Sequence, residues 1–273
     1  EPIYKERIKK IIYLDKDKLK LNLKYFEHQH KVINYDFESG IPYFEDLFSS
    51  KLKYLFGNPR EINEPITQFH KDLAASMQSV MEDIVIEKLN SYHASNKYKN
   101  LCISGGCAFN SVLNGKLIQK TNFENIYSSQ NVGDAGGAVG AALYTAFENK
   151  VEIERSSSLY LGPKYDDKDV NKVIEKNLTY GKNYERIFFD NFEKLCDFVS
   201  KFLAEKKIVG WYQDAMEWGP RSLGNRSILA DPRHKDIRDL INLKIKLREE
   251  FRPFAPAVLL EKTNQYFNLS KNS

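Results

Sequence analysis

The side chains best suited to chemistry lie toward the end of the chain, in a segment rich in glycine, proline and arginine. Residues 216–233 carry Arg221, Asn225 and Arg226. Glycine and proline turns hold such side chains in defined backbone positions, and a planar guanidinium can bind a phosphate group through two parallel hydrogen bonds. The segment therefore predicts a site for a small polyanion such as a phosphate or a nucleotide triphosphate.

A second cationic segment follows at residues 244–256 and contributes Lys246 and Arg252 to the same constellation. The alternative interpretation is a solvated charged loop. Large apolar neighbours such as Trp218 and Phe254 argue against that alternative, because solvated loops rarely combine fixed turns with large apolar side chains. We expect the two segments to serve one anion site.

A glycine pair earlier in the chain favours nucleotide binding. Gly105 and Gly106 stand between a predicted strand and a predicted helix. Paired glycines let backbone N–H groups approach a phosphate, and the amino end of a helix adds a favourable field. A tight turn between a strand and a helix explains the pair equally well.

A second glycine-rich segment, residues 133–137, contains Gly133, Asp134 and Gly136. Asp134 could cap the following helix, or it could offer a carboxylate to a divalent metal beside a nucleotide phosphate. Loops at the ends of neighbouring strands converge on one crevice. This convergence favours the functional interpretation of both glycine segments.

The elements that would position the glycine segments repeat one arrangement. Strand, glycine-rich turn and helix occur twice, which is typical of an α/β sheet. The predicted strands are residues 100–104 and 125–127, and the predicted helices are residues 108–119 and 138–147.

A long helix is predicted from Asn63, which could cap it, with Pro65 in its first turn. Its predicted core stripe consists of Ile66, Phe69, Leu73, Met77, Val80 and Ile84. His70 on this helix is more simply structural than a metal ligand. Residues 1–60 predict a helix-poor excursion with short strands.

The composition changes near residue 160, where we expect a domain boundary. Beyond it, Asp190 and Glu193 have the spacing of a capping box at the start of a helix. The cationic segments would be framed by strands over residues 207–212 and 227–230 and by a charged helix over residues 236–247.

Composition argues against several classes without excluding nucleic acid outright. The chain has 273 residues, 42% of them hydrophobic, and a formal net charge of +4 without a run of like charges. We therefore expect no nucleic-acid partner and, since no stretch could span a bilayer, no membrane association. Cys102, Cys107 and Cys196 form no C-x-x-C pair, which fits a reducing cytoplasm.

Four motifs carry a resemblance to a known family. They are GGCAFNSV at residues 105–112, GDAGGA at 133–138, EWGPRSLGNRSILADPR at 217–233 and REEFRPFAP at 248–256. These motifs resemble those of the nodulation-protein-U type carbamoyltransferases, which include antibiotic O-carbamoyltransferases acting on cephalosporins and aminoglycosides. The similarity runs along the whole chain, and residues 217–256 are its most specific part.

The resemblance implies an ATP-dependent O-carbamoyltransferase of α/β class, α+β in its second part. Residues 1–160 would be the second half of an actin-like, sugar-kinase-like transfer domain. Residues 161–273 would be part of an adenylate-forming domain resembling threonylcarbamoyl-AMP synthase. Carbamoyl phosphate and ATP would give carbamoyl-adenylate, whose carbamoyl group would pass to a hydroxyl of a sugar-like or antibiotic-like small molecule.

The same resemblance implies roles for individual residues and cofactors. Arg221, Lys246 and Arg252 match positions that bind carbamoyl phosphate and the phosphates of ATP, and Asn225 and Arg226 share that motif. Asp134 matches a metal-ligating carboxylate. The implied cofactors are ATP with Mg²⁺ and Fe²⁺, and a homodimer is a common state. The residues matching nucleotide-facing loops are Gly105, Gly106, Asn110, Gly133 and Gly136.

The chain departs from the family pattern in one respect. Family members begin with a further actin-like half that holds an H-x-x-x-H pair, whereas here His28 and His30 are two apart and no such pair occurs. The family also continues beyond Ser273. We therefore expect a fragment that is inactive on its own.

Three alternatives stay open. A sugar or acid kinase of the actin-like superfamily would release ADP, whereas adenylate formation releases AMP and pyrophosphate. A non-catalytic nucleotide-binding module would ignore carbamoyl phosphate. Threonylcarbamoyl transfer to tRNA is disfavoured by the lack of a basic stripe.

Overall fold

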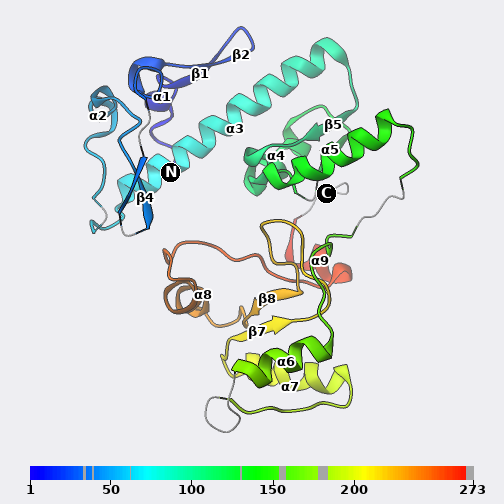
Figure 1. Cartoon of the computed structure of the whole chain (residues 1–273). Helices are drawn as coiled ribbons and strands as arrows, with labels where there is room; N and C mark the ends of the chain where they lie inside the picture. The colour runs from blue at the N-terminus through cyan, green and yellow to red at the C-terminus, as the bar shows by residue number, and fades with distance from the viewer. Residues whose placement is uncertain are drawn as a thin grey trace. The chain divides into compact units, whose positions relative to one another are not determined.

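The computed structural model describes residues 1–32, 35–38, 40–61, 63–129, 131–153, 158–177 and 184–268 (Figure 1). Helices and short strands alternate along the chain, so the broad α/β prediction is confirmed. The chain forms two compact units. The first holds Glu1–Cys102 and Asn110–Tyr127, and the second holds Ile103–Phe109 and the described residues from Ser128 onward.

The first unit opens with short elements, as predicted for residues 1–60. Two antiparallel hairpins alternate with single-turn helices. The elements are α1 (Lys5–Ile8), β1 (Ile12–Asp15), β2 (Lys18–Leu21), β3 (Tyr35–Glu38), β4 (Ile41–Phe44) and α2 (Lys53–Phe56).

The long helix α3 (Gln68–Asn96) begins later than predicted. Thr67, not Asn63, is its N-cap, and it forms a capping box in which the His70 ring accepts the Thr67 N–H at 3.0 Å. The structural interpretation of His70 is therefore consistent with this cap. Figure 1 shows α3 running beside the hairpin of β1 and β2.

The buried stripe of α3 is more polar than predicted. Asp72, Ser76 and Val80, spaced four apart, are buried, whereas Ile66 and Met77 are exposed. Both polar members bind the start of the chain: Asp72 pairs with the amino terminus at Glu1, and the Ser76 hydroxyl accepts the backbone N–H of Tyr4 at 2.9 Å. These polar side chains can be buried because each forms a hydrogen bond with the start of the chain.

The first predicted strand–turn–helix–strand pattern is present. Strand β5 (Asn100–Ile103) pairs with β6 (Asn125–Ser128), and α4 (Ser111–Lys120) lies between them in sequence. Leu113, Leu117 and Phe123 are buried here. The second glycine segment leads into α5 (Asp134–Glu148).

Two further helices, α6 (Asp167–Asn177) and α7 (Phe192–Ala204), precede the hairpin that carries the first cationic segment. The N-cap of α7 is Asn191, whose side chain accepts the Lys194 N–H at 2.9 Å. The predicted capping box of Asp190 and Glu193 is therefore wrong by one residue.

Strands β7 (Val209–Tyr212) and β8 (Arg226–Leu229) form an antiparallel hairpin, close to the predicted strands. Helix α7 packs on β7 (Figure 1). The rings of Phe192 and Trp211 meet edge to face there, with their centroids 6.1 Å apart. The hairpin thus supplies a packed base for the loop between its strands.

The predicted charged helix is shorter and irregular. It consists of α8 (Ile237–Ile241) and a π-helical turn, Asn242–Lys246, which ends where Leu247 adopts a left-handed backbone with φ of 48°. The π-helix is rare, is mostly a single turn, and is frequently found at functional sites. One more short helix, α9 (Thr263–Tyr266), follows. Within the described ranges, no helix combines the length and apolarity that crossing a bilayer requires.

Candidate functional site

The connection between β7 and β8 carries the start of the first cationic segment, and we call residues 217–226 the clamp loop. The register pairs Tyr212 with Arg226 across its base. Gly219 and Gly224 have φ of 115° and 112°, a backbone region that favours glycine. The two glycines therefore shape the loop on either side of Arg221.

A buried carboxylate lies at the centre of the clamp loop. Glu217 is only 7% exposed, and its Oε1 accepts backbone N–H groups from Leu223 and Asn225 at 2.8 Å and from Arg226 at 3.2 Å. Burial by itself would raise the pKa of this carboxyl, but the N–H groups outweigh that effect and lower the pKa to about 2. Glu217 is therefore ionised at neutral pH, and its carboxylate satisfies the N–H donors that face the inside of the loop.

Asn225 is buried in the same network. Its Nδ2 donates to the Ala215 carbonyl at 2.7 Å, and its Oδ1 accepts from Gln213 at 3.0 Å. These partners occupy both ends of the side-chain amide. The structure thus gives Asn225 a bracing position in the predicted site.

Arg226 is also engaged within the protein. Its guanidinium donates to the carbonyls of Gln213, Asp214 and Asn225, and it lies 3.5 Å from the Tyr212 ring centroid. Backbone carbonyls and an aromatic face are good partners for a planar cation. Arg226 therefore holds the two sides of the loop together.

Arg221 differs from its neighbours in the loop. It is exposed, and within the part of the chain that the structure describes its side chain has no hydrogen bond or ion pair. A guanidinium with its donors free on a braced backbone is suited to an external anion.

The second cationic segment is organised by another buried polar residue, Asn242, which has no exposed surface. Its Nδ2 donates to the carbonyls of Glu250 and Arg252 at 3.1 and 2.9 Å, and its Oδ1 accepts from Arg248 Nε at 2.7 Å. Asn242 thus closes the turn that carries Lys246.

The cations of this turn have different surroundings. Lys246 is exposed, with no hydrogen bond or ion pair of its side chain among the described residues. Arg252 pairs with Glu249 at 2.8 Å on the surface, and the Arg248 guanidinium lies 4.8 Å from the Phe254 ring centroid. Lys246, like the exposed Lys244, therefore has its donors available.

The two glycine segments meet, as predicted. The Gly105 N–H donates to the Val132 carbonyl at 2.7 Å. A side chain at Gly133 would lie 2.9 Å from the Phe109 ring, and one at Gly136 would collide with the backbone oxygen of Asn131. Gly133 and Gly136 thus permit close packing, while Gly106 has open space where a side chain would be.

Asn131 links the second glycine segment to the clamp loop. It is 2% exposed, and its side chain lies against Gly219, where an added Cβ would be 3.3 Å from Nδ2. That Nδ2 is buried without a hydrogen-bond partner among the described residues. Asn131, Glu217 and Asn242 could not be singled out from the sequence, because a buried polar side chain leaves no periodic signal.

Asn110 has a local role in the structure. Its Oδ1 accepts the Leu113 N–H at 3.0 Å and so caps α4, and its Nδ2 donates to Gln78 at 2.9 Å. Both polar atoms of the Asn110 side chain are therefore engaged within the protein.

Asp134 is exposed at the first position of α5. No group of three or more His, Cys, Asp or Glu side chains suited to holding a metal ion occurs among the described residues. These residues therefore do not by themselves fit a complete iron or magnesium site, and we derive no step through a metal.

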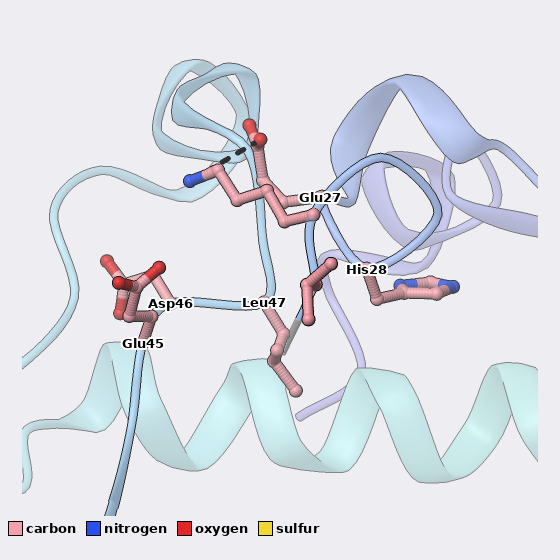
Figure 2. Close-up of a pocket in the computed structure, with 7 residues that line it drawn as sticks. Glu27, His28, Glu45, Asp46 and Leu47 are labelled. Atoms are coloured by element: carbon pink, nitrogen blue, oxygen red, sulfur yellow. Dashed lines mark ion pairs between the residues drawn. The ribbon is translucent and has the colours of Figure 1, made fainter. Parts of the chain in front are cut away.

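A surface pocket in the first unit is unrelated to the predicted site residues. Figure 2 shows Glu45 and Asp46 on the opposite side of this pocket from the His28 ring, while Glu27 pairs with Lys31 at 3.7 Å. The side chains do not converge on a common point, so the pocket offers no catalytic constellation.

Comparison with known families agrees with the motifs in the two glycine segments and the two cationic segments. A model described as the carbamoyltransferase N-terminus matches residues 6–143, and one described as the carbamoyltransferase C-terminus matches residues 200–273. The chain therefore belongs to the carbamoyltransferase family.

Individual relatives support this assignment. Nodulation protein NolNO of Sinorhizobium fredii is 39% identical over 208 residues, 75% of this chain and 30% of that protein. Nodulation protein NolO of Bradyrhizobium diazoefficiens is 37% identical over 207 residues, 75% of this chain and 37% of that protein. An uncharacterized Synechocystis protein is 40% identical over 82% of this chain and 37% of its own length. The chain spans about a third of the length of these curated relatives.

Proposed function

We propose that the protein is an ATP-dependent O-carbamoyltransferase that converts carbamoyl phosphate and ATP into carbamoyl-adenylate and then transfers the carbamoyl group to a hydroxyl of a sugar-like or antibiotic-like small molecule. Family membership supports carbamoyl transfer in general. The nodulation relatives share the motifs without specifying this chain's acceptor.

The observation that carries the proposal is a contrast among the cations of the C-terminal family segment. Arg226 and Arg252 are engaged by carbonyls, an aromatic ring or a carboxylate, whereas Arg221 and Lys246 are exposed and unpaired in the described part of the chain. Each free cation stands on a turn that a buried polar residue braces. Braced cations of this kind stabilise charge that moves onto phosphate oxygens.

The reaction moves charge onto phosphate oxygens at two points, when pyrophosphate leaves and when AMP leaves, and such cations would stabilise that charge at both. A carbamoyl group is a poor electrophile, and attachment to AMP gives it a better leaving group. In the first step, water would cleave carbamoyl phosphate to carbamate and phosphate. A carbamate oxygen then attacks the α-phosphorus of ATP, pyrophosphate leaves, and the later attack of the acceptor hydroxyl releases AMP.

The remaining assignments are part of the proposal. The first family segment would belong to an actin-like transfer domain and the second to an adenylate-forming domain, with the boundary near residue 160. Gly105 and Gly106 would face the nucleotide, and Asp134 would be one ligand of an iron or magnesium ion whose other ligands lie outside the described residues. We place the reaction in the cytoplasm, in keeping with three free cysteines.

The test measures product release by the full-length protein with ATP, Mg²⁺ and Fe²⁺. We expect AMP and pyrophosphate only when carbamoyl phosphate is present, and at least a tenfold loss in Arg221→Ala and Lys246→Ala. Arg238→Ala, on the exposed side of α8, is the matched control and should retain full release. ADP as the product would indicate a kinase, and release independent of carbamoyl phosphate would also refute the proposal.

A further inference from the structure

Arg221 is placed by its backbone alone. Its side chain makes no hydrogen bond or ion pair among the described residues, so nothing attached to the guanidinium fixes where it points. A side chain of this kind is only as well positioned as the loop that carries it. The position of Arg221 therefore depends on what holds the clamp loop.

The two ends of the clamp loop are held and its middle is not. At one end, Asn225 donates to the Ala215 carbonyl at 2.7 Å, and Gly224 N–H donates to the Ser227 hydroxyl at 3.1 Å. At the other end, Trp218 N–H donates to the Leu159 carbonyl at 2.7 Å. The stretch that contains Arg221 bridges these two anchored ends.

Glu217 is the group that joins the ends. It lies at the start of the loop, and the three N–H groups that its Oε1 accepts belong to the far end, six, eight and nine residues later. Convergent backbone N–H groups form a concavity that binds an anion. Here the anion is the protein's own carboxylate, so these donors are not available to a substrate phosphate.

We propose that Glu217 is a positioning residue that, by filling this concavity with its carboxylate, closes the clamp loop and presents Arg221 to an external phosphate group. The proposal rests on the proposed function for the identity of the ligand. It does not make Glu217 a catalytic residue, since the carboxylate faces the interior of the loop.

The experiment uses the full-length protein in two measurements, with Glu217→Ala, Glu217→Gln and Arg221→Ala as variants and Glu205→Ala, at an exposed glutamate beyond α7, as the control. The first measurement is hydrogen exchange at the amides of Leu223, Asn225 and Arg226. The second is the dissociation constant for carbamoyl phosphate. It is measured at a temperature far below the thermal unfolding midpoint of each variant, so that every variant compared is folded.

We expect Glu217→Ala to exchange these three amides at least about tenfold faster and to raise the dissociation constant at least about tenfold. Glu217→Gln keeps the shape without the charge and should fall between Glu217→Ala and the wild type. Arg221→Ala should lose binding with unchanged exchange. Glu205→Ala should change neither quantity.

A residue that only adds stability would leave the dissociation constant of the folded protein unchanged. Equal constants for the wild type and Glu217→Ala therefore overturn the proposal, as does unchanged exchange at the three amides. If Glu217→Ala does not fold, the same criteria apply to Glu217→Gln. If the wild type ignores carbamoyl phosphate, the proposed function fails, and the exchange measurement still decides whether Glu217 closes the loop.

Discussion

The side-chain amide of Asn242 donates to the backbone carbonyl of Arg252 at 2.9 Å, across ten residues of sequence. The same amide reaches the Glu250 carbonyl and accepts from Arg248, so one side chain satisfies three groups of the turn. Asn242 has no exposed surface, which means that water cannot replace it. The second cationic segment therefore depends on Asn242 for its shape.

Replacement of Asn242 by alanine should destabilise the protein by about 2–3 kcal/mol, because two backbone carbonyls and the Arg248 guanidinium lose a partner that is itself buried. Urea unfolding measures the change. Asn177→Ala is the control, since Asn177 is exposed and, among the residues that the structure describes, its side chain bonds to a carbonyl of its own helix. This variant should stay within about 0.5 kcal/mol of the wild type. A similar cost for both variants would contradict the bracing role.

Stability should fall in acid in a defined window. The pKa values of Glu217 and Asp231 are lowered from 4.5 and 3.8 to about 2, so the unfolded chain binds more protons than the folded one between these limits. Their contribution is complete above pH 4.5 and is lost as pH falls through 2. Urea unfolding from pH 2.5 to 7 should give a free energy that rises with pH up to about 4.5.

Glu217→Gln is the control for this pH dependence, because it lacks the titrating group and should show a smaller slope. The Asp231 contribution should persist in that variant, since Arg233 holds the pKa of Asp231 down through side-chain and backbone hydrogen bonds. Identical slopes of unfolding free energy against pH in the variant and the wild type would show that Glu217 does not contribute to the acid sensitivity.

Two adjacent glycines in the first turn of α5 should respond in opposite ways to alanine. A side chain at Gly136 would collide with the Asn131 backbone, so Gly136→Ala should cost about 1–3 kcal/mol. Gly137 has open space at the same position, and Gly137→Ala should be neutral or stabilising by up to about 1 kcal/mol. Thermal unfolding of the two variants side by side decides this.

Arg226 and Arg221 should separate stability from ligand binding. Arg226→Ala removes three hydrogen bonds and the contact with Tyr212, and we expect a loss of about 1–3 kcal/mol in unfolding free energy. Arg221→Ala should change stability by less than about 0.5 kcal/mol. Urea unfolding tests both, and an equal effect of the two variants would show that Arg221 is also engaged.

The ion pair of Lys116 with Glu82 should matter more than a surface pair. Glu82 is 5% exposed, and burial would raise its pKa, but hydrogen bonds from Lys116 and Gln78 prevail and lower it. Lys116→Ala should cost about 1–3 kcal/mol in chemical unfolding, because a buried carboxylate loses its charge partner. Lys99→Ala, at an exposed pair, should cost less than about 1 kcal/mol.

Local patterns predicted much of the secondary structure. Strands β5, β7 and β8 lie within one or two residues of their predicted positions, because short runs bounded by turn residues are long enough for a strand and too short for a helix. Helix starts were less accurate. Thr67 and Asn191 were missed as caps, since several polar residues near each start could serve and only the folded backbone selects among them.

The candidate site, too, could be predicted from the sequence only in part. The kinds of residue needed to bind phosphate, and the family to which they belong, could be deduced from residues 217–256. Which of the cations are free and which are engaged could not be deduced from the same residues. Arg221 and Arg226 lie in one motif with similar neighbours, yet one is exposed and the other bonds to carbonyls up to thirteen residues away.

The sequence by itself therefore determined the chemical inventory of this protein, namely its cations, its glycine turns and its family. Only the tertiary structure decided that Glu217 and Asn242 are buried and that Arg221 and Lys246 face outward. The physical reason is that a side chain's partners are set by where distant backbone N–H and carbonyl groups come to lie. Those positions follow from the fold of the β7–β8 hairpin and the turn after α8, which no spacing of residue types encodes.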